Sequence, residues 1–255
     1  MGQDPIISAS LHSGHYLPSE IGHWIALSRQ ERIWFEEPWL AEWVMLTRNR
    51  IVLRRSRFAG DLERSPNKII YNNHDADPGV RVWKTEPSEV IKRSIKKYYK
   101  SFYWEMEAYF SAIARQWKHF VVLNYHTVPS RITTAEKRRS HSLDRSPDIL
   151  VEVGPLNDRT AWQPLIDAFL GDLDNGTLKG VPVKVIEVEQ PSHGAFANWI
   201  HSHHGDSACV LTVNVPRFFQ KVWKDEVDYP MLDELQNLFA STLPGILKHL
   251  PSDGH

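Results

Sequence analysis

The sequence predicts an α/β fold of three layers (α/β/α), with helices on both faces of a mostly parallel or mixed central sheet. Two observations support this prediction. Short apolar, β-prone runs alternate along the chain with amphipathic segments of helical periodicity. One run, residues 208–215, is almost continuously apolar, as is typical of a central strand buried on both faces.

Composition limits the possible classes of protein. The chain of 255 residues is long enough for one substantial domain and contains no stretch typical of a linker, so we expect a single domain over residues 1–255. Its formal net charge of −1 argues against nucleic-acid binding. Because no signal peptide and no apolar run of ~20 residues is visible, we expect a cytoplasmic protein without membrane contact. The sequence leaves the oligomeric state open, a homo-oligomer included.

Several elements are predicted in the N-terminal third. Residues 6–10 are β-prone, and Gly14 lets the chain turn soon afterwards. Glu36-Glu37-Pro38 is expected to open a helix within residues 31–46, because proline and acidic side chains are favoured in a first helical turn. Leu40, Val44 and Met45 would face the core from that helix. The other predicted elements here are a helix over 19–27, a strand over 50–54 and an irregular loop over 67–87 with a short strand at 80–83.

A long helix is predicted to begin after the capping residue Ser88 and to end near Trp117, because apolar residues recur through it at helical spacing. It leads into an apolar strand over residues 120–126, as in a crossover between parallel strands. Residues 129–147 are polar and basic, and we expect them to form a lid over the site. The remaining predictions are strands over 146–154, 181–188 and 208–215 and helices over 162–173, 194–201 and 231–247.

Two predicted strands lead to a histidine. His12 follows the first strand, and His126 ends the strand that begins at Phe120. Open α/β sheets bind ligands at the carboxyl ends of their strands, so both imidazoles would face one site. Two imidazoles and one carboxylate form a zinc set that leaves a position for water, and the carboxylates of the 36–38 segment could complete it. A zinc-activated water could then hydrolyse an amide.

Arginines are concentrated in residues 54–66, together with Gly60, Asp61 and Pro66. A solvated run of charge accounts for this composition. A shaped loop that directs guanidinium groups at a carboxylate accounts for it equally well. The residues alone do not decide between the two interpretations.

Together, these motifs resemble the N-formylglutamate amidohydrolase family. They occur in the family's order over residues 6–220: Leu11-His12-Ser13-Gly14 with Pro18, Glu36-Glu37-Pro38, Arg54 through Pro66, Val122 through Thr127, and Pro147-Asp148-Ile149. The resemblance implies the fold of zinc-dependent exopeptidases. It also implies a metal-dependent deformylase that releases formate from a small, carboxylate-bearing N-formyl amino acid, late in histidine breakdown.

The resemblance further implies the residues of the site. His12 and His126 match the family's motif histidines, and Glu37 falls where the family has an acid at the first helix. The implied ligands of zinc, or of another divalent metal, are His12, Glu37 and His126, with Glu36 and His15 as rivals for the third place. The implied substrate-binding residues are Arg57, Asp61 and Arg64, and the basic segments around them add Arg54 and Arg131 as candidates.

The chain departs from the family's motifs at three positions. Asn124 replaces the aspartate of Asp-Leu-His-Ser, and Glu63 replaces the asparagine of Asp-Leu-Asn-Arg. On the late strand, Asn214 stands where the family commonly has a glutamate suited to general-base work, and an amide cannot take up a proton at neutral pH.

The catalytic positions expected near this strand are Asn214 itself and Glu189, with Glu187 and Glu152 as other candidate acids. Two alternative functions remain at this point. One is a non-catalytic protein that binds a small anionic ligand. The other is a zinc amidase that acts on a peptide or a cell-wall fragment.

Overall fold

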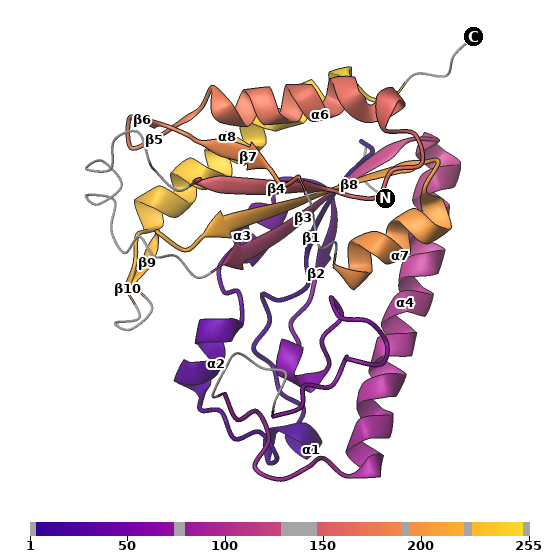
Figure 1. Ribbon diagram of the computed structural model, residues 1–255, viewed down its shortest axis with the longest axis vertical. Coiled ribbons are helices and arrows are strands. Elements are labelled where there is room, and N and C mark those ends of the chain that lie inside the picture. Colours follow the sequence, from indigo (N-terminus) through magenta and orange to yellow (C-terminus); the bar gives the residue numbers. More distant parts are fainter. Residues whose placement is uncertain (1–3, 74–79, 129–146, 190–193, 222–225, 252–255) are drawn as a thin grey trace.

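The computed structural model describes residues 4–73, 80–128, 147–189, 194–221 and 226–251. Its centre is a six-stranded sheet with the strand order β2-β1-β3-β8-β4-β7 (Figure 1). All neighbouring strands are parallel except β4 and β8, which are antiparallel. The strands of the sheet are β1 (Ile6–Ser10), β2 (Asn49–Val52), β3 (Phe120–Val128), β4 (Ile149–Val153), β7 (Val185–Glu187) and β8 (Ala208–Pro216). Two hairpins add β5 (Thr177–Leu178) with β6 (Val181–Pro182), and β9 (Gln220–Lys221) with β10 (Glu226–Val227).

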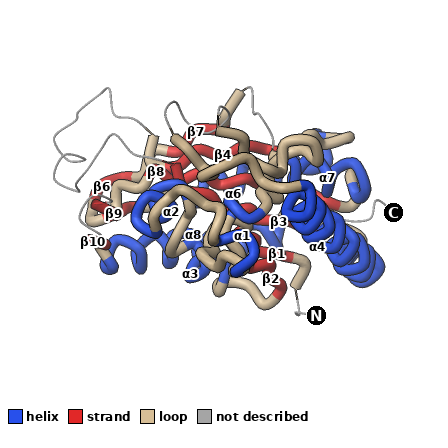
Figure 2. The backbone as a smooth tube through the Cα atoms, turned by 90° about the horizontal axis from the view of Figure 1, so that it is seen from below, coloured by secondary structure: helices blue, strands red, loops and turns tan. Residues whose placement is uncertain are grey.

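Helices cover both faces of this sheet, so the predicted three-layer α/β architecture is confirmed. Seen from below, the strands separate α4 and α7 from α3 and α8 (Figure 2). Residues of α3, α6 and α8 share one apolar core with the sheet, and residues of α4 and α7 share the other. The helices are α1 (Ser19–Gly22), α2 (Arg29–Phe35), α3 (Leu40–Val44), α4 (Glu89–Trp117), α6 (Arg159–Asp174), α7 (Ala195–His204) and α8 (Tyr229–Lys248), with a 3-10 turn at Arg57–Ala59.

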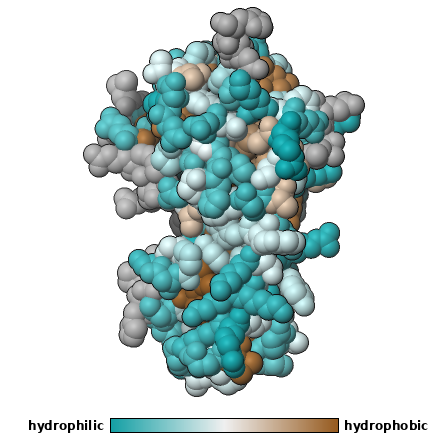
Figure 3. All heavy atoms as spheres, turned by 90° about the vertical axis from the view of Figure 1, so that its right-hand side faces the viewer, coloured by the Kyte–Doolittle hydropathy of each residue, from teal (hydrophilic) through white to brown (hydrophobic). Residues whose placement is uncertain are grey.

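Helix α4 has the predicted start, because the Ser88 hydroxyl accepts a hydrogen bond from the backbone N–H of Ile91 at 3.4 Å. Its apolar residues, including Ile95, Phe102 and Phe110, are buried against the sheet. The molecular face on this side is largely hydrophilic, with apolar side chains in small separate groups (Figure 3). Of the helices in the described ranges, none is long and apolar enough for a membrane span.

The segment 36–38 does not open a helix, so this prediction was wrong. A capping box of Ser28 and Glu31 starts α2 earlier, and the helix ends at Phe35, with Glu36 in extended conformation as its C-cap. The next helix, α3, begins only after Trp39, whose φ is 77°. Both carboxylates therefore lie in the turn between two short helices. Leu40 and Val44 are buried as predicted, but Met45 is exposed.

Three other elements are shorter than predicted. Helix α1 ends at Gly22 instead of Leu27, and the segment 80–83 forms only a single bridge between Trp83 and Ile25. The predicted strand over 181–188 is divided, because a turn at Lys179 and Gly180, both at positive φ, pairs Val181–Pro182 with β5. Only Val185–Glu187 joins the main sheet. The predicted lid lies almost wholly outside the described residues.

The sheet face toward α4 and α7 changes character along its strands. In their first halves, β3 and β8 present Phe120 and Val122 beside Ala208 and Val210, all buried in one apolar core. Side chains alternate between the two faces along a strand, so every second residue of β3 and β8 belongs to this face. In the second halves of both strands, the residues at these positions are polar. Asn124 and His126 then lie beside Thr212 and Asn214, with Glu152 opposite Thr212 on β4. We call these five residues the polar strip.

We predict that Gly14→Ala destabilises the fold, because a Cβ at Gly14 would lie 2.2 Å from the carbonyl carbon of Arg54. Backbone must move to admit it, and we expect the free energy of unfolding to fall by roughly 1–3 kcal/mol. The control is Gly171→Ala in α6, where a Cβ meets nothing within 4 Å. That change should stabilise the helix by up to about 1 kcal/mol. Denaturant titration of both variants checks this, and equal stabilities would contradict it.

Candidate metal centre

His12, Glu37 and His126 converge at the carboxyl ends of β1 and β3, which are neighbouring parallel strands. His12 follows β1, His126 lies in β3, and Glu37 comes from the turn between α2 and α3. The two imidazole rings are 5.3 Å apart between centroids. One potential ligand atom from each of the three residues lies within 4.8 Å of the others. Residues that are far apart in the chain therefore form one compact group.

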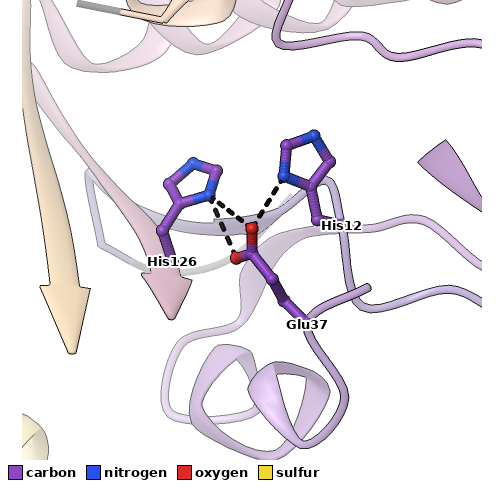
Figure 4. A group of neighbouring side chains, drawn as sticks. All are labelled: His12, Glu37 and His126. Atoms are coloured by element: carbon purple, nitrogen blue, oxygen red, sulfur yellow. Dashed lines mark hydrogen bonds and ion pairs between the residues drawn. The ribbon is translucent and has the colours of Figure 1, made fainter. Parts of the chain in front are cut away.

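The carboxylate of Glu37 lies between the two rings (Figure 4). Nδ1 of His12 donates to Oε1 at 2.9 Å, and Nδ1 of His126 donates to Oε2 at 3.1 Å. The backbone N–H of Thr127 also donates to Oε2, at 3.0 Å. The backbone N–H of Glu37 donates in turn to the carbonyl of His12 at 2.9 Å, which anchors the turn to the end of β1.

Each ring holds a second carboxylate with its other nitrogen. Nε2 of His12 lies 2.8 Å from Oδ1 of Asp61, and Nε2 of His126 lies 3.2 Å from Oε1 of Glu63. Because carboxylates only accept hydrogen bonds, both rings carry two protons here. Burial lowers the pKa of His126, but Glu37 and Glu63 outweigh it and raise this pKa to about 10. Burial and Arg57 lower the pKa of His12, and the neighbouring acids raise it above its usual value.

The donor set fits a divalent metal ion. Both Nδ1 atoms are directed at one buried carboxylate, so loss of their protons would leave two imidazoles and one acid around a common point. Metal-binding histidines usually donate their other N–H to a carboxylate, as His12 does to Asp61 and His126 does to Glu63. Two imidazoles and a carboxylate form a common catalytic zinc set.

Arg57 and Asp61 support His12 in the structure. The Arg57 guanidinium donates to Oδ2 of Asp61 at 2.9 Å, to the Tyr71 hydroxyl at 2.8 Å and to the Phe35 carbonyl at 3.3 Å. Tyr71 in turn donates to Asp61. Burial raises the pKa of Asp61, but the charges of Arg57 and His12 hold it well below its usual range. Direct contact of these two residues with substrate stays a prediction, and their contacts here hold the imidazole in place.

His15 and Glu36 pair with each other and lie outside the group of three. Nδ1 of His15 is 2.5 Å from Oε2 of Glu36, which is fully buried and also receives hydrogen bonds from Arg32 and Ser56. Of the rival third ligands, the structure therefore brings Glu37 to the two imidazoles. Burial raises the pKa of Glu36, and its donors outweigh this and lower it below its usual value.

The other predicted substrate-binding arginines lie in different surroundings. Arg54 is exposed and lines a surface cavity of about 640 Å³ with Gly14 and His15. Arg64 is half-buried, with its guanidinium 4.5 Å from the centre of the Tyr71 ring. Arg131 lies outside the described residues.

The predicted catalytic residues lie in or near different strands. Asn214 lies directly opposite His126 in the sheet, and its Nδ2 donates to Oε1 of Glu152 at 3.1 Å. Glu189 is exposed just beyond β7, and β7 is three strands away from β3. Glu187 forms a surface ion pair with Arg159 at 2.6 Å. Of the candidate acids, Glu152 alone belongs to the polar strip.

Sequence reasoning missed two residues at this site. It noted Glu63 only as a departure from a motif, although this carboxylate holds His126. It missed Arg217, which is buried and donates to the Thr127 hydroxyl at 2.9 Å, beside the backbone N–H that binds Glu37. In the sequence, Arg217 follows closely on the predicted strand over 208–215. The structure pairs this strand, β8, with β3, which brings Arg217 to the site.

Comparison with known proteins supports the resemblance. The chain is similar to the crystal structure of N-formylglutamate amidohydrolase from Ralstonia eutropha JMP134, with 18% sequence identity, a TM-score of 0.68 and coverage of 94% of this chain and 92% of that chain. It is also similar to the crystal structure of gene product Atu2144 from Agrobacterium tumefaciens, with 14% identity, a TM-score of 0.56 and coverage of 96% and 92%. At these identities, the likeness shows a common fold.

The search of the curated proteins found no match. The family model described as N-formylglutamate amidohydrolase matches residues 4–214, which is most of the chain and includes every residue of the group of three. The chain therefore belongs to the N-formylglutamate amidohydrolase family, a family of hydrolases.

Proposed function

We propose that the protein is a metal-dependent amidohydrolase that releases formate from a small N-formyl amino acid. The observation that carries the proposal is the convergence of two imidazole Nδ1 atoms on the buried carboxylate of Glu37. Family membership supports the amide reaction and the formyl group. A place in histidine breakdown and in the cytoplasm agrees with this substrate class and stays a prediction.

Zinc, or another divalent ion, would be held by His12, Glu37 and His126. When bound, such an ion supplies Lewis-acid chemistry, because it lowers the pKa of a water and polarises an acyl carbonyl. Asp61 keeps Nε2 of His12 protonated, so that Nδ1 of this ring is the ligand atom. The backbone N–H of Thr127 holds Oε2 of Glu37 and fixes the direction of this carboxylate.

Glu152 is our candidate for proton transfer. Its carboxylate is half-buried on the same sheet face as His126, and Asn214 orients it by donating to Oε1. Glu152 would take a proton from the attacking water as the C–O bond forms. It would return that proton to the leaving nitrogen as the C–N bond breaks, which yields formate and the free amino acid. Asn214 would thus contribute to proton transfer by orienting Glu152, and its own amide would not gain or lose a proton.

Arg64 is our candidate for binding the substrate's carboxylate. It follows Glu63 directly in the chain, and it is half-buried, so a bound carboxylate would be partly shielded from water. Arg57 has a supporting role in the structure, because its guanidinium holds Asp61, Tyr71 and the Phe35 carbonyl. Arg54 and Arg131 remain further candidates.

We predict that purified protein binds one equivalent of zinc or a similar ion and releases formate from N-formylglutamate. Chelation should abolish turnover, and added zinc should restore it. His126→Ala should lose both the metal and the activity, whereas His23→Ala, which changes an exposed histidine, should keep both. Elemental analysis and a formate assay measure this. Stoichiometric metal without turnover of any N-formyl amino acid would instead support a non-catalytic binding protein.

We predict that Glu152→Gln lowers kcat by about 10²–10⁴-fold, because the amide cannot carry the proton. Metal content and melting temperature should stay near those of the unaltered protein, since Glu152 lies outside the group of three. Glu189→Gln, at an exposed site beyond β7, is the matched control and should retain full activity. If Glu189→Gln lost activity and Glu152→Gln did not, proton transfer would belong to Glu189.

We predict that zinc affinity rises with pH well above neutrality. The raised pKa of His126, about 10, keeps a proton on Nδ1 at pH 7, and the ion must displace it. Apparent affinity should therefore increase about tenfold or more per pH unit between pH 7 and 8.5. An imidazole with its ordinary pKa would give a plateau there. Calorimetry in buffers of different ionisation enthalpy would count the released protons, and a count of zero would refute this prediction.

A further inference from the structure

We propose that Glu63 is a positioning residue for the metal site, acting through His126. Its carboxylate holds the proton on Nε2 of this ring and thereby presents Nδ1 to the ion. The inference rests on the proposed function, because the ion itself belongs to that proposal. It adds a specific role for a residue that lies outside the group of three.

Glu63 is anchored at both carboxylate oxygens. Oε1 receives Nδ2 of Asn124 at 2.9 Å and Nε2 of His126 at 3.2 Å, and Oε2 receives the backbone N–H of Phe196 at 3.4 Å. Phe196 lies in the first turn of α7, where the helix dipole favours a negative charge. The Glu63 side chain is only 7% exposed, so little water competes for these contacts. The carboxylate is thus fixed by contacts on both sides.

Close packing at the start of α7 supports this arrangement. A Cβ at Gly194 would lie 2.2 Å from Oε2 of Glu63, so a larger residue would push the carboxylate away. The backbone N–H of Ala195 donates to the Glu63 carbonyl at 3.0 Å. The helix start and the residue at position 63 are therefore built against each other.

One short segment supports both imidazoles. Asp61 holds Nε2 of His12, Glu63 holds Nε2 of His126, and the backbone N–H of Glu63 donates to Oδ1 of Asp61 at 3.0 Å. The two carboxylates therefore have equivalent roles on the two rings. This equivalence distinguishes Glu63 from an acid that merely fills space.

Asn124 cannot replace this carboxylate in its present orientation. Its Nδ2 lies 3.1 Å from Nε2 of His126, and both nitrogens donate to the same oxygen of Glu63. The amide oxygen points elsewhere, where it is buried and has no hydrogen-bond partner among the described residues. A carboxylate at position 124 would instead accept from His126 directly. Exchanging acid and amide between positions 63 and 124 should therefore preserve both the charge and the support of the ring.

The test is an isosteric exchange. Glu63→Gln should weaken zinc binding about 10–100-fold, as is usual when a partner of a ligating histidine is lost. The double variant Glu63→Gln with Asn124→Asp should return to within about threefold of the unaltered protein. Glu105→Gln, at an exposed position of α4, controls for loss of one negative charge. Zinc affinity is measured by competition with a chelating dye, and the protonated ring nitrogen of His126 by ¹⁵N chemical shifts of the zinc-loaded protein.

Two results would overturn the proposal. One is a Glu63→Gln variant with unaltered zinc affinity while the unaltered protein binds zinc, which leaves the proposed function standing. The other is a double variant as weak as Glu63→Gln, which would show that the acid is needed for packing at position 63. If Glu63→Gln fails to fold, as its metal-free melting curve would reveal, the double variant decides alone. Failure of the proposed function is visible separately, as absence of zinc binding in the unaltered protein.

Discussion

The site depends on balanced charge in a place that water barely reaches. Three acids, Glu37, Asp61 and Glu63, contact three cations, the doubly protonated His12 and His126 and the guanidinium of Arg57. An isolated buried charge costs several kcal/mol or more, so each of these groups requires its neighbours. A divalent ion that displaces the two Nδ1 protons leaves the total charge unchanged. The same residues can therefore hold either the protons or the ion without an unpaired charge.

The fold brings these groups together by placing them at the ends of elements. His12 and His126 reach the site because β1 and β3 are parallel neighbours, so their carboxyl ends meet. The face that carries His126 is apolar where α4 and α7 cover it, and polar beyond that cover. Glycine permits a close approach at the start of α7, where Gly194 admits the carboxylate of Glu63. The polar residues of the site therefore lie on the part of the sheet face that α4 and α7 leave uncovered.

The sequence predicted those features that depend on residues close together in the chain. The cap at Ser88, the long helix and the strand-end histidines follow from periodicity and turn chemistry within a few residues. The segment 36–38 was misassigned, because a stronger capping box at Ser28 starts the helix earlier and Glu36 is used by Arg32 and Ser56. The role of Glu63 was missed for a different reason. Its partner His126 is 63 positions away, and no local pattern records that contact.

At two positions where the resemblance leads us to expect an acid, Asn124 and Asn214, the structure pairs the amide with a carboxylate. Asn124 donates to Glu63 and Asn214 donates to Glu152, so each amide that stands in place of an expected acid lies against a glutamate from another segment. A carboxylate thus remains within hydrogen-bond distance at both places, on a different residue. A motif compares one position of the sequence at a time. The cost of burying a charge depends on all the charged and polar groups around it, whichever segments they come from. At both places, an amide in the sequence therefore has a buried or half-buried carboxylate as its hydrogen-bond partner in space.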